Sequence, residues 1–281
     1  MRADEKEIPL SVIELIPILD DMLISFLKKL GKDDWNRQTI AKKWKVKDVA
    51  AHLLDGNIRG LSFGRDNHLL EPDITINSEA DLVNYLNNLN AEWVHAAKRI
   101  SPELIIEFLD NTNKAHYEYV NTLDPFAKAI FPVSWAGEKE SQNWFHLARE
   151  YTEKWIHQQQ IRDAFDNKDL MTRDLFFPMI DIIMYGLPNT FKNVKANDGC
   201  TIKINILTEI GGAWYLKLVE DKWTLLKKHS GEINSEIQIP PDTAWKLFTK
   251  SLRPDDIKSE VKFSGDLNFG NLVLEMVSVM A

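Results

Sequence analysis

The sequence contains very little cysteine. Cys200 is the single one in 281 residues, so the chain cannot build an internal disulfide framework, and this suits a reducing compartment. One cysteine is still enough for a catalytic thiol. However, Cys200 follows Asp198 and Gly199 at the start of a strand-like run, and this position favours a packed or incidental thiol.

Long hydrophobic runs are also missing. The longest apolar stretch extends from Phe176 to Leu187 and is interrupted by Asp181, whereas a membrane-spanning helix needs about 20 apolar residues. The first ten residues, MRADEKEIPL, are too acidic for the positively charged start of a signal peptide. We therefore expect a cytoplasmic protein without a membrane partner.

Basic residues are in the minority. Lys and Arg together number 34 against 42 Asp and Glu, which gives a formal net charge of -8. A nucleic-acid-binding domain usually carries a basic patch, and the short run from Lys42 to Lys47 is more simply the approach to a helix. The sequence also lacks a glycine-rich phosphate loop and the G-x-S-x-G motif. We expect a small-molecule substrate and no nucleic-acid partner.

The overall composition is that of a globular protein, with 44% hydrophobic and 27% charged residues. In the first two-thirds of the chain, apolar residues recur at spacings of three and four, which predicts helices. Ser101 and Pro102 supply a helix start, whereas Pro17 should kink or restart the first helix. The predicted helices cover residues 10–30, 46–63, 79–100, 102–121, 141–165 and 174–191.

The period of the hydrophobic pattern changes to two after Lys195. Alternation predicts strands at residues 201–208, 214–218, 223–227 and 235–239, and a short helix from Pro241 to Leu252 follows them. Such a switch indicates a domain boundary. We expect an α+β protein in which residues 1–192 form a helical bundle and residues 200–281 form a small α/β domain.

Three side chains suggest a metal site. Glu153 and His157 are four residues apart, so a helix places them on one face, and His52 is the best candidate for a third ligand. Two His and one Glu with an open position are typical of a catalytic zinc site. The spacing alone is common, however, and the polar faces of both helices could equally well meet solvent.

Two motifs resemble one family. The segment from Trp44 to Leu54, WKVKDVAAHLL, resembles the W-x-V-x-D-V-x-A-H-L signature of the maleylpyruvate isomerase branch of the DinB-like proteins. The E-x-x-x-H pair Glu153 and His157, with Ile161-Arg162-Asp163 after it, resembles a second motif of that family. The closing segments, residues 263–266 and 272–280, look like the end of the sterol-carrier-like domain of many members.

The resemblance implies both a fold and a chemistry. It implies a DinB-like bundle followed by a sterol-carrier-like domain, with a divalent metal, usually zinc, bound by His52, Glu153 and His157. It also implies a low-molecular-weight thiol as cosubstrate, which the metal activates for a transferase or isomerase reaction. The candidates for catalytic contacts are Asp55, one turn after His52, and Arg253, the sole Arg beyond residue 173.

Two other functions stay open. One is a non-catalytic protein that binds a metal or an apolar ligand, and the other is a metal-dependent hydrolase that activates water instead of a thiol. Stoichiometric metal separates the first alternative from an enzyme of this type, and thiol dependence of turnover separates the second.

Overall fold

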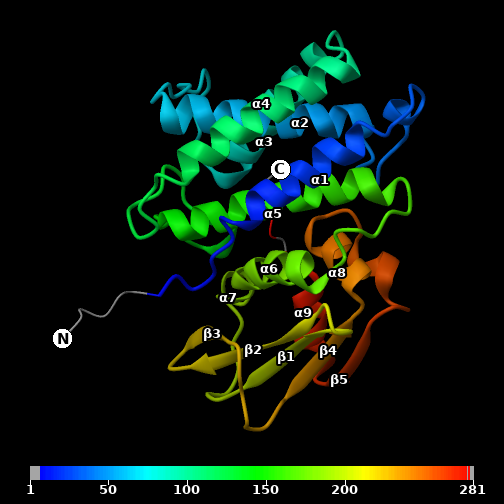
Figure 1. Ribbon diagram of the computed structural model, residues 1–281. Helices are drawn as coiled ribbons and strands as arrows, with labels where there is room; N and C mark the ends of the chain where they lie inside the picture. Colours follow the sequence, from blue (N-terminus) through cyan, green and yellow to red (C-terminus); the bar gives the residue numbers. More distant parts are fainter. Residues whose placement is uncertain (1–6, 277, 279–281) are drawn as a thin grey trace, which may run out of the picture. The chain divides into compact units, whose positions relative to one another are not determined.

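The computed structural model describes residues 7–276 and 278. Over these residues the chain forms two compact units (Figure 1). The first comprises residues up to 131 and 141–168, and the second comprises residues 132–140 and the described part of 169–280. Helices make up the first unit and a five-stranded sheet lies in the second, which confirms the predicted α+β class.

The first unit contains five α-helices and two short helical turns. Ser101 caps α4 as predicted, because its side chain accepts a hydrogen bond of 3.2 Å from the backbone N–H of Leu104, with Pro102 at the first helical position. The helices are α1 (Leu15–Leu27), α2 (Val46–Gly60), α3 (Glu79–Ala97), α4 (Pro102–Val120) and α5 (Asn143–Asp163), with the 3-10 helix η1 (Asp34–Asn36) and the π-helix η2 (Leu61–Arg65).

The core of this unit lies between α1, α2, α4 and α5. Its centre holds Val49 and Leu54 of α2, Ile105 and Leu109 of α4 and Ile161 of α5, all fully buried. Burial of such side chains stabilises the fold by roughly 1.5–3 kcal/mol each. Helix α5 is buried over most of its surface, and the polar positions Glu150, Glu153 and His157 keep partial exposure.

The predicted helix at residues 10–30 begins later than expected. Helix α1 starts at Leu15, so Pro17 lies in its first turn. A proline there removes no hydrogen bond, because the first backbone N–H groups of a helix have no acceptor within it. Pro17 therefore lies at the start of a continuous helix, which agrees with the expected restart and not with a kink.

The second unit is built on a mixed sheet in the order β3-β2-β1-β4-β5. The pair β1–β4 is parallel and the other neighbouring pairs are antiparallel. Ile202, Ile204 and Ile206 are buried on one face of β1, as the alternation predicted. The strands are β1 (Thr201–Ile206), β2 (Gly212–Val219), β3 (Lys222–Leu226), β4 (Ser235–Ile239) and β5 (Lys262–Gly265).

Helices accompany this sheet within the same unit. Trp214 on β2 donates a hydrogen bond of 2.6 Å to Asp181 on α6, which places α6 at the buried face of the sheet. Pro178 lies inside α6, and the predicted helix at 174–191 is divided before Pro188. The helices are η3 (Ser134–Ala136), α6 (Arg173–Ile183), η4 (Met184–Gly186), α7 (Leu187–Thr190), α8 (Pro241–Phe248), η5 (Pro254–Ile257) and α9 (Leu267–Leu274).

The two compact units divide the chain before the predicted linker. Helices α6 and α7, which we placed in the bundle, belong to the second unit, because their side chains pack with β2 and β3. The boundary at residues 192–200 stays a proposal about folding domains. The closing segment 272–280 lies partly outside the described residues, and its described beginning is the end of α9.

Candidate functional site

Helices α2 and α5 of the first unit carry the three candidate metal ligands. Helix α2 buries Val49, Ala50 and Leu54 completely, and His52 projects from a different side of the helix and keeps partial exposure. Glu153 and His157 lie one turn apart on α5. Both helices pack against each other in the first unit, so the three side chains come from neighbouring elements.

The structure brings these three side chains together. The imidazole rings of His52 and His157 lie with their centroids 4.6 Å apart. The Nε2 atom of His157 is 3.3 Å from Oε2 of Glu153. Exposed fractions of 14% for the His157 side chain and 29% for that of Glu153 describe groups that are partly enclosed and still reachable by solvent.

Two further residues hold the imidazoles. The indole of Trp44, two residues before the start of α2, has its centroid 4.6 Å from that of the His52 ring and 6.0 Å from that of the His157 ring. Behind His157, its Nδ1 atom lies 2.9 Å from Oε1 of Gln160. One side of the cluster is therefore aromatic, and the opposite nitrogen of His157 has a polar partner on its own helix.

The electrostatics of the cluster suit metal ligands. Burial, together with the neighbouring His157 and Arg59, holds the pKa of His52 well below its usual 6.5, so this imidazole is neutral and has a free lone pair. Burial tends to raise the pKa of Glu153. The hydrogen bond from His157 and the charges of His157 and Arg149 outweigh it, and the net pKa is lowered.

The polar stripe of α5 continues beyond the candidate ligands. Arg149 contacts the carboxylate of Glu150 and has its Nη1 atom 3.9 Å from Oε1 of Glu153. His146, one turn before Glu150, is 9% exposed. The stripe is therefore a partly enclosed row of interacting polar groups, and not a fully solvated helix face.

A divalent metal fits the chemistry of the donor set. Two imidazoles and one carboxylate are donors that zinc uses, and Nδ1 of His52 is buried without a hydrogen-bond partner among the residues that the structure describes. The same residues contain no group of three or more His, Cys, Asp and Glu side chains arranged closely enough to hold an ion in their present positions. His52, Glu153 and His157 are therefore neighbours, and their side chains do not surround one common point in these positions.

The two candidate catalytic residues lie in different units. Asp55 is buried on α2 and forms an ion pair of 3.0 Å with Arg59. Burial raises the pKa of Asp55 against the opposing effect of Arg59. Arg253 is exposed in the second unit, where its backbone N–H donates a hydrogen bond of 2.8 Å to Asp256 at the start of η5.

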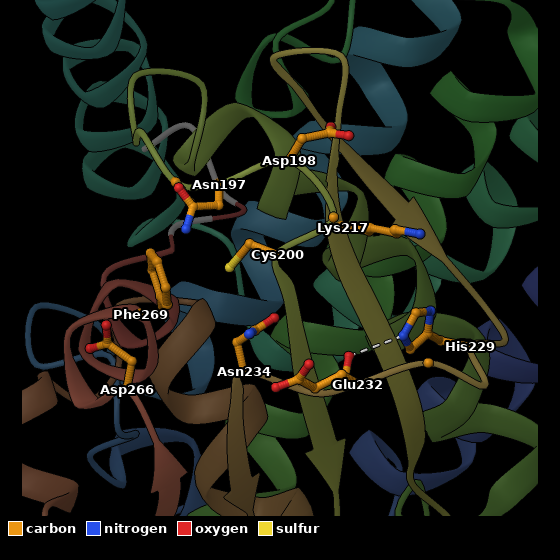
Figure 2. A pocket seen from close by; sticks show the side chains of 12 residues that line it. Asn197, Asp198, Cys200, Lys217, His229, Glu232, Asn234, Asp266 and Phe269 are labelled. Carbon is orange, nitrogen blue, oxygen red and sulfur yellow. Dashed lines mark hydrogen bonds between the residues drawn. The ribbon is translucent and has the colours of Figure 1, made fainter.

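A separate pocket of about 650 Å³ lies in the second unit (Figure 2). Cys200, Lys217, His229, Asp266 and Phe269 are among its lining residues, and none of the five candidate site residues takes part. Burial and the nearby Asp266 raise the pKa of the Cys200 thiol. A raised pKa keeps the thiol protonated and unreactive, in line with the packed cysteine that the sequence favoured.

Sequence reasoning missed three residues of the site. Trp44 was noted solely as part of a motif, and neither Arg149 nor Gln160 was singled out. A signal was present for Arg149, because it precedes Glu153 by four residues on the same helix. For Gln160 the spacing of three from His157 was available, but glutamine side chains at this spacing are common on helix surfaces.

A comparison with protein families identifies most of the first unit. The sequence profile described as the mycothiol maleylpyruvate isomerase N-terminal domain matches residues 18–162. No curated protein matches the sequence. Within the described part of the chain, no helix combines the length and the apolar character needed to cross a membrane.

Solved structures extend the likeness. The mycothiol-dependent maleylpyruvate isomerase and a histidine-to-alanine mutant of it each superpose with a TM-score of 0.55 at 9% identity, over 90% of this chain and 91% of theirs. Sterol carrier protein 2 like 2 from Aedes aegypti matches 35% of this chain and 95% of its own, at 14% identity and a TM-score of 0.28. Because the profile match spans more than half of the sequence, the chain belongs to the mycothiol maleylpyruvate isomerase N-terminal domain family.

Proposed function

We propose that this protein is a metal-dependent enzyme that uses a low-molecular-weight thiol as cosubstrate, in a transferase or cis–trans isomerase reaction on a small electrophilic substrate. Family membership supports the thiol-dependent class. The observation that carries the proposal is the meeting of His52, His157 and Glu153 from two helices, with the imidazoles 4.6 Å apart.

The residues of the chain have defined tasks in this proposal. His52, Glu153 and His157 would hold the divalent ion, with zinc as the expected metal. When bound, such an ion supplies a Lewis acid that lowers the pKa of a thiol or a water molecule. Burial keeps His52 neutral and therefore ready to donate its lone pair. Arg149 holds the Glu153 carboxylate from the side opposite to His157.

Asp55 and Arg253 enter the proposal as residues for substrate contacts. Asp55 is already oriented by its ion pair with Arg59 on the same helix. Arg253 is an exposed guanidinium suited to a substrate carboxylate. Asp55→Asn and Arg253→Gln should each leave the metal content unchanged and reduce turnover. Loss of metal in one of these variants would mean that the residue supports the fold and does not contact the substrate.

The test of the proposed function is metal content followed by thiol dependence. We expect about one divalent ion per chain in purified protein, and His157→Ala should lose most of it. Turnover of an activated alkene should require a thiol, with mycothiol and glutathione compared at equal concentration. Full metal occupancy in His157→Ala would contradict the ligand set, and turnover without thiol would favour the hydrolase.

The non-catalytic alternative is separated by the same measurements. A protein that merely binds a metal would carry the ion without thiol-dependent turnover of any electrophile tested, and one that merely binds an apolar ligand would carry no stoichiometric ion. A preparation that contains no metal after growth and purification in zinc-supplemented medium would contradict the metal-dependent enzyme and the metal-binding protein alike.

A further inference from the structure

The imidazole of His157 lies between two oxygen atoms that come from its own helix. Its Nε2 atom faces Oε2 of Glu153 at 3.3 Å, and its Nδ1 atom faces Oε1 of Gln160 at 2.9 Å. Glu153 precedes His157 by four residues and Gln160 follows it by three. Helix α5 thus carries the ligand pair and a partner for the remote nitrogen on one rigid element.

An imidazole that binds a metal needs this kind of partner. A neutral ring has one N–H and one lone pair, and an acceptor behind the ring fixes which nitrogen keeps the proton and how the ring is oriented. The Gln160 side chain is suited to this task because it is 6% exposed, so water has little access to compete for its amide oxygen.

The other imidazole of the site is held in a different way. Nδ1 of His52 is buried and lacks a hydrogen-bond partner over residues 7–276 and 278. The ring of His52 is instead in contact with the indole of Trp44. Of the two imidazoles, the one on α5 therefore has a polar side chain behind it, and this asymmetry makes Gln160 the residue to test.

We propose that Gln160 is a positioning residue, whose amide oxygen accepts the Nδ1 proton of His157, so that Nε2, which faces Glu153 as a hydrogen-bond donor in the metal-free chain, would be the atom that binds the ion. This inference rests on the proposed function, since it concerns how well the cluster binds a divalent ion. The competing explanation is that Gln160 fills space in a buried part of the bundle and contributes packing alone.

Two substitutions separate these explanations. Gln160→Met keeps the length of the side chain and removes the oxygen acceptor, and Gln160→Glu keeps an oxygen at the same distance. The neighbouring Gln159 offers a matched control, because its side chain is fully buried and neither of its polar atoms is hydrogen-bonded within the described residues. Gln159→Met changes a buried amide of the same helix without touching His157.

The experiment measures Zn²⁺ and Co²⁺ affinity of the full-length proteins by competition with a chromophoric chelator at a single pH. We expect Gln160→Met to weaken binding roughly 10- to 100-fold, the usual effect of removing such a partner. Gln160→Glu should bind within about threefold of the unsubstituted protein or more tightly, and Gln159→Met should bind unchanged. Circular dichroism shows whether each variant is folded.

A second measurement does not depend on any variant. In ¹⁵N-histidine-labelled protein loaded with Zn²⁺, the His157 signals should show a proton on Nδ1 and none on Nε2. The opposite tautomer would overturn the proposal. Equal metal affinity in Gln160→Met and the unsubstituted protein, or equal losses in Gln160→Met and Gln160→Glu, would overturn it as well. Absence of metal binding by the unsubstituted protein would instead contradict the proposed function itself.

Discussion

At the scale of single residues, the most unusual feature of the bundle is a buried lysine. Lys154 of α5 is 7% exposed, and its ammonium group lies 2.7 Å from Oδ1 of Asp20 and 3.1 Å from the side-chain oxygens of Asn57 and Asn113. These partners belong to α1, α2 and α4. One cation therefore connects four helices, and it forms an ion pair with Asp20.

Removal of this cation should destabilise the bundle strongly. Lys154→Met leaves the Asp20 carboxylate buried without a counter-ion, a change that typically costs about 3–5 kcal/mol. The measurement is the free energy of unfolding in urea. As a control, Lys114→Met removes a surface lysine that pairs with Asp110 and is 67% exposed, so its effect should stay below about 1 kcal/mol. Equal effects of the two substitutions would contradict a structural role for the buried pair.

Two buried histidines should make stability depend on pH. Burial lowers the pKa values of His116 and His146 from 6.5 to about 4. The positive charges of Lys154, near His116, and of Arg149, near His146, lower these pKa values further. Glu150 acts in the opposite direction on both. Between pH 4 and 6.5 these two histidines bind more protons in the unfolded chain than in the folded one. The free energy of unfolding is therefore highest above pH 6.5 with respect to these groups, and it decreases as the pH falls towards 4.

The expected loss is about 3 kcal/mol for each histidine, because one pKa unit corresponds to about 1.4 kcal/mol. Chelator-treated protein should be titrated with urea at several pH values between 4 and 7. His116→Gln removes one of three histidines with a lowered pKa, His52 being the third, so the slope of the unfolding free energy against pH should fall by about a third. An unchanged slope in that variant would show that the acid sensitivity comes from other groups.

The candidate site was predictable only in part from the residues themselves. The spacing of Glu153 and His157 and the motif around His52 led to side chains that the structure places together. The assignment of these three as metal ligands stays a prediction. The burial of Lys154 was not foreseeable, because its partners come from three helices that are distant in the sequence, and helical periodicity does not reveal which polar groups meet.

At the scale of elements, the contact between α2 and α4 depends on glycine. A Cβ atom added at Gly60 would lie 2.7 Å from Nε2 of the buried His116, and one added at Gly64 in η2 would lie 2.4 Å from the hydroxyl oxygen of Tyr119. These distances are shorter than van der Waals contact allows. The end of α2 and the π-helix that continues it can therefore approach α4 closely because side chains are absent there.

We expect opposite effects from two glycine substitutions in α2. Gly60→Ala should destabilise the protein by about 1–3 kcal/mol, since a methyl group must be inserted against a packed ring. Gly56→Ala should stabilise it by up to about 1 kcal/mol through helix propensity, because an added Cβ there meets no described atom within 4 Å. Thermal unfolding of the two variants measures both effects. Equal changes of the same sign would mean that the α2–α4 contact adjusts easily.

Local sequence rules predicted the strands well, because alternation identified the buried residues of β1, β2 and β4. The effect of the prolines depended on their position in the folded helices. Pro17 left two expectations open, a kink or a restart of the helix, and its place in the first turn of α1 corresponds to the restart. Pro178 is inside α6 without ending it, and the packing of this apolar helix outweighs the missing hydrogen bond.

At the scale of the whole molecule, the chain divides into units that do not coincide with the switch in hydrophobic period. Helix α6 is helical in sequence pattern but belongs with the sheet. Arg173 donates a hydrogen bond of 3.2 Å to the carbonyl oxygen of Glu209, Phe177 stacks on Trp214 at 5.7 Å, and Asp181 accepts the hydrogen bond from Trp214. A period identifies the type of an element, but not the partner against which it packs.

These contacts predict how fragments of the second unit behave. A fragment that begins at Asp169 retains the partners of Trp214 on α6. It also retains two partners of Trp223, whose ring packs on Phe191 at 5.3 Å and whose indole N–H donates a hydrogen bond of 2.9 Å to the carbonyl oxygen of Val194. A fragment that begins at Cys200 keeps the contact of Trp223 with Phe269 at 6.2 Å but loses these other contacts, and it uncovers two indoles that are now 1% and 3% exposed. Burial of aromatic side chains dominates core energetics.

We therefore expect residues 169–281 to give a dispersed amide NMR spectrum and a cooperative unfolding transition, and residues 200–281 to be unfolded or aggregated. The comparison also tests the predicted linker at residues 192–200, because a self-sufficient domain would fold from Cys200 onwards. In addition, Asp181→Asn in the longer fragment keeps an acceptor for the Trp214 indole but removes the carboxylate that Lys227 contacts. That variant should still fold with a lower transition temperature, and a folded 200–281 fragment would show that α6 is dispensable to the sheet.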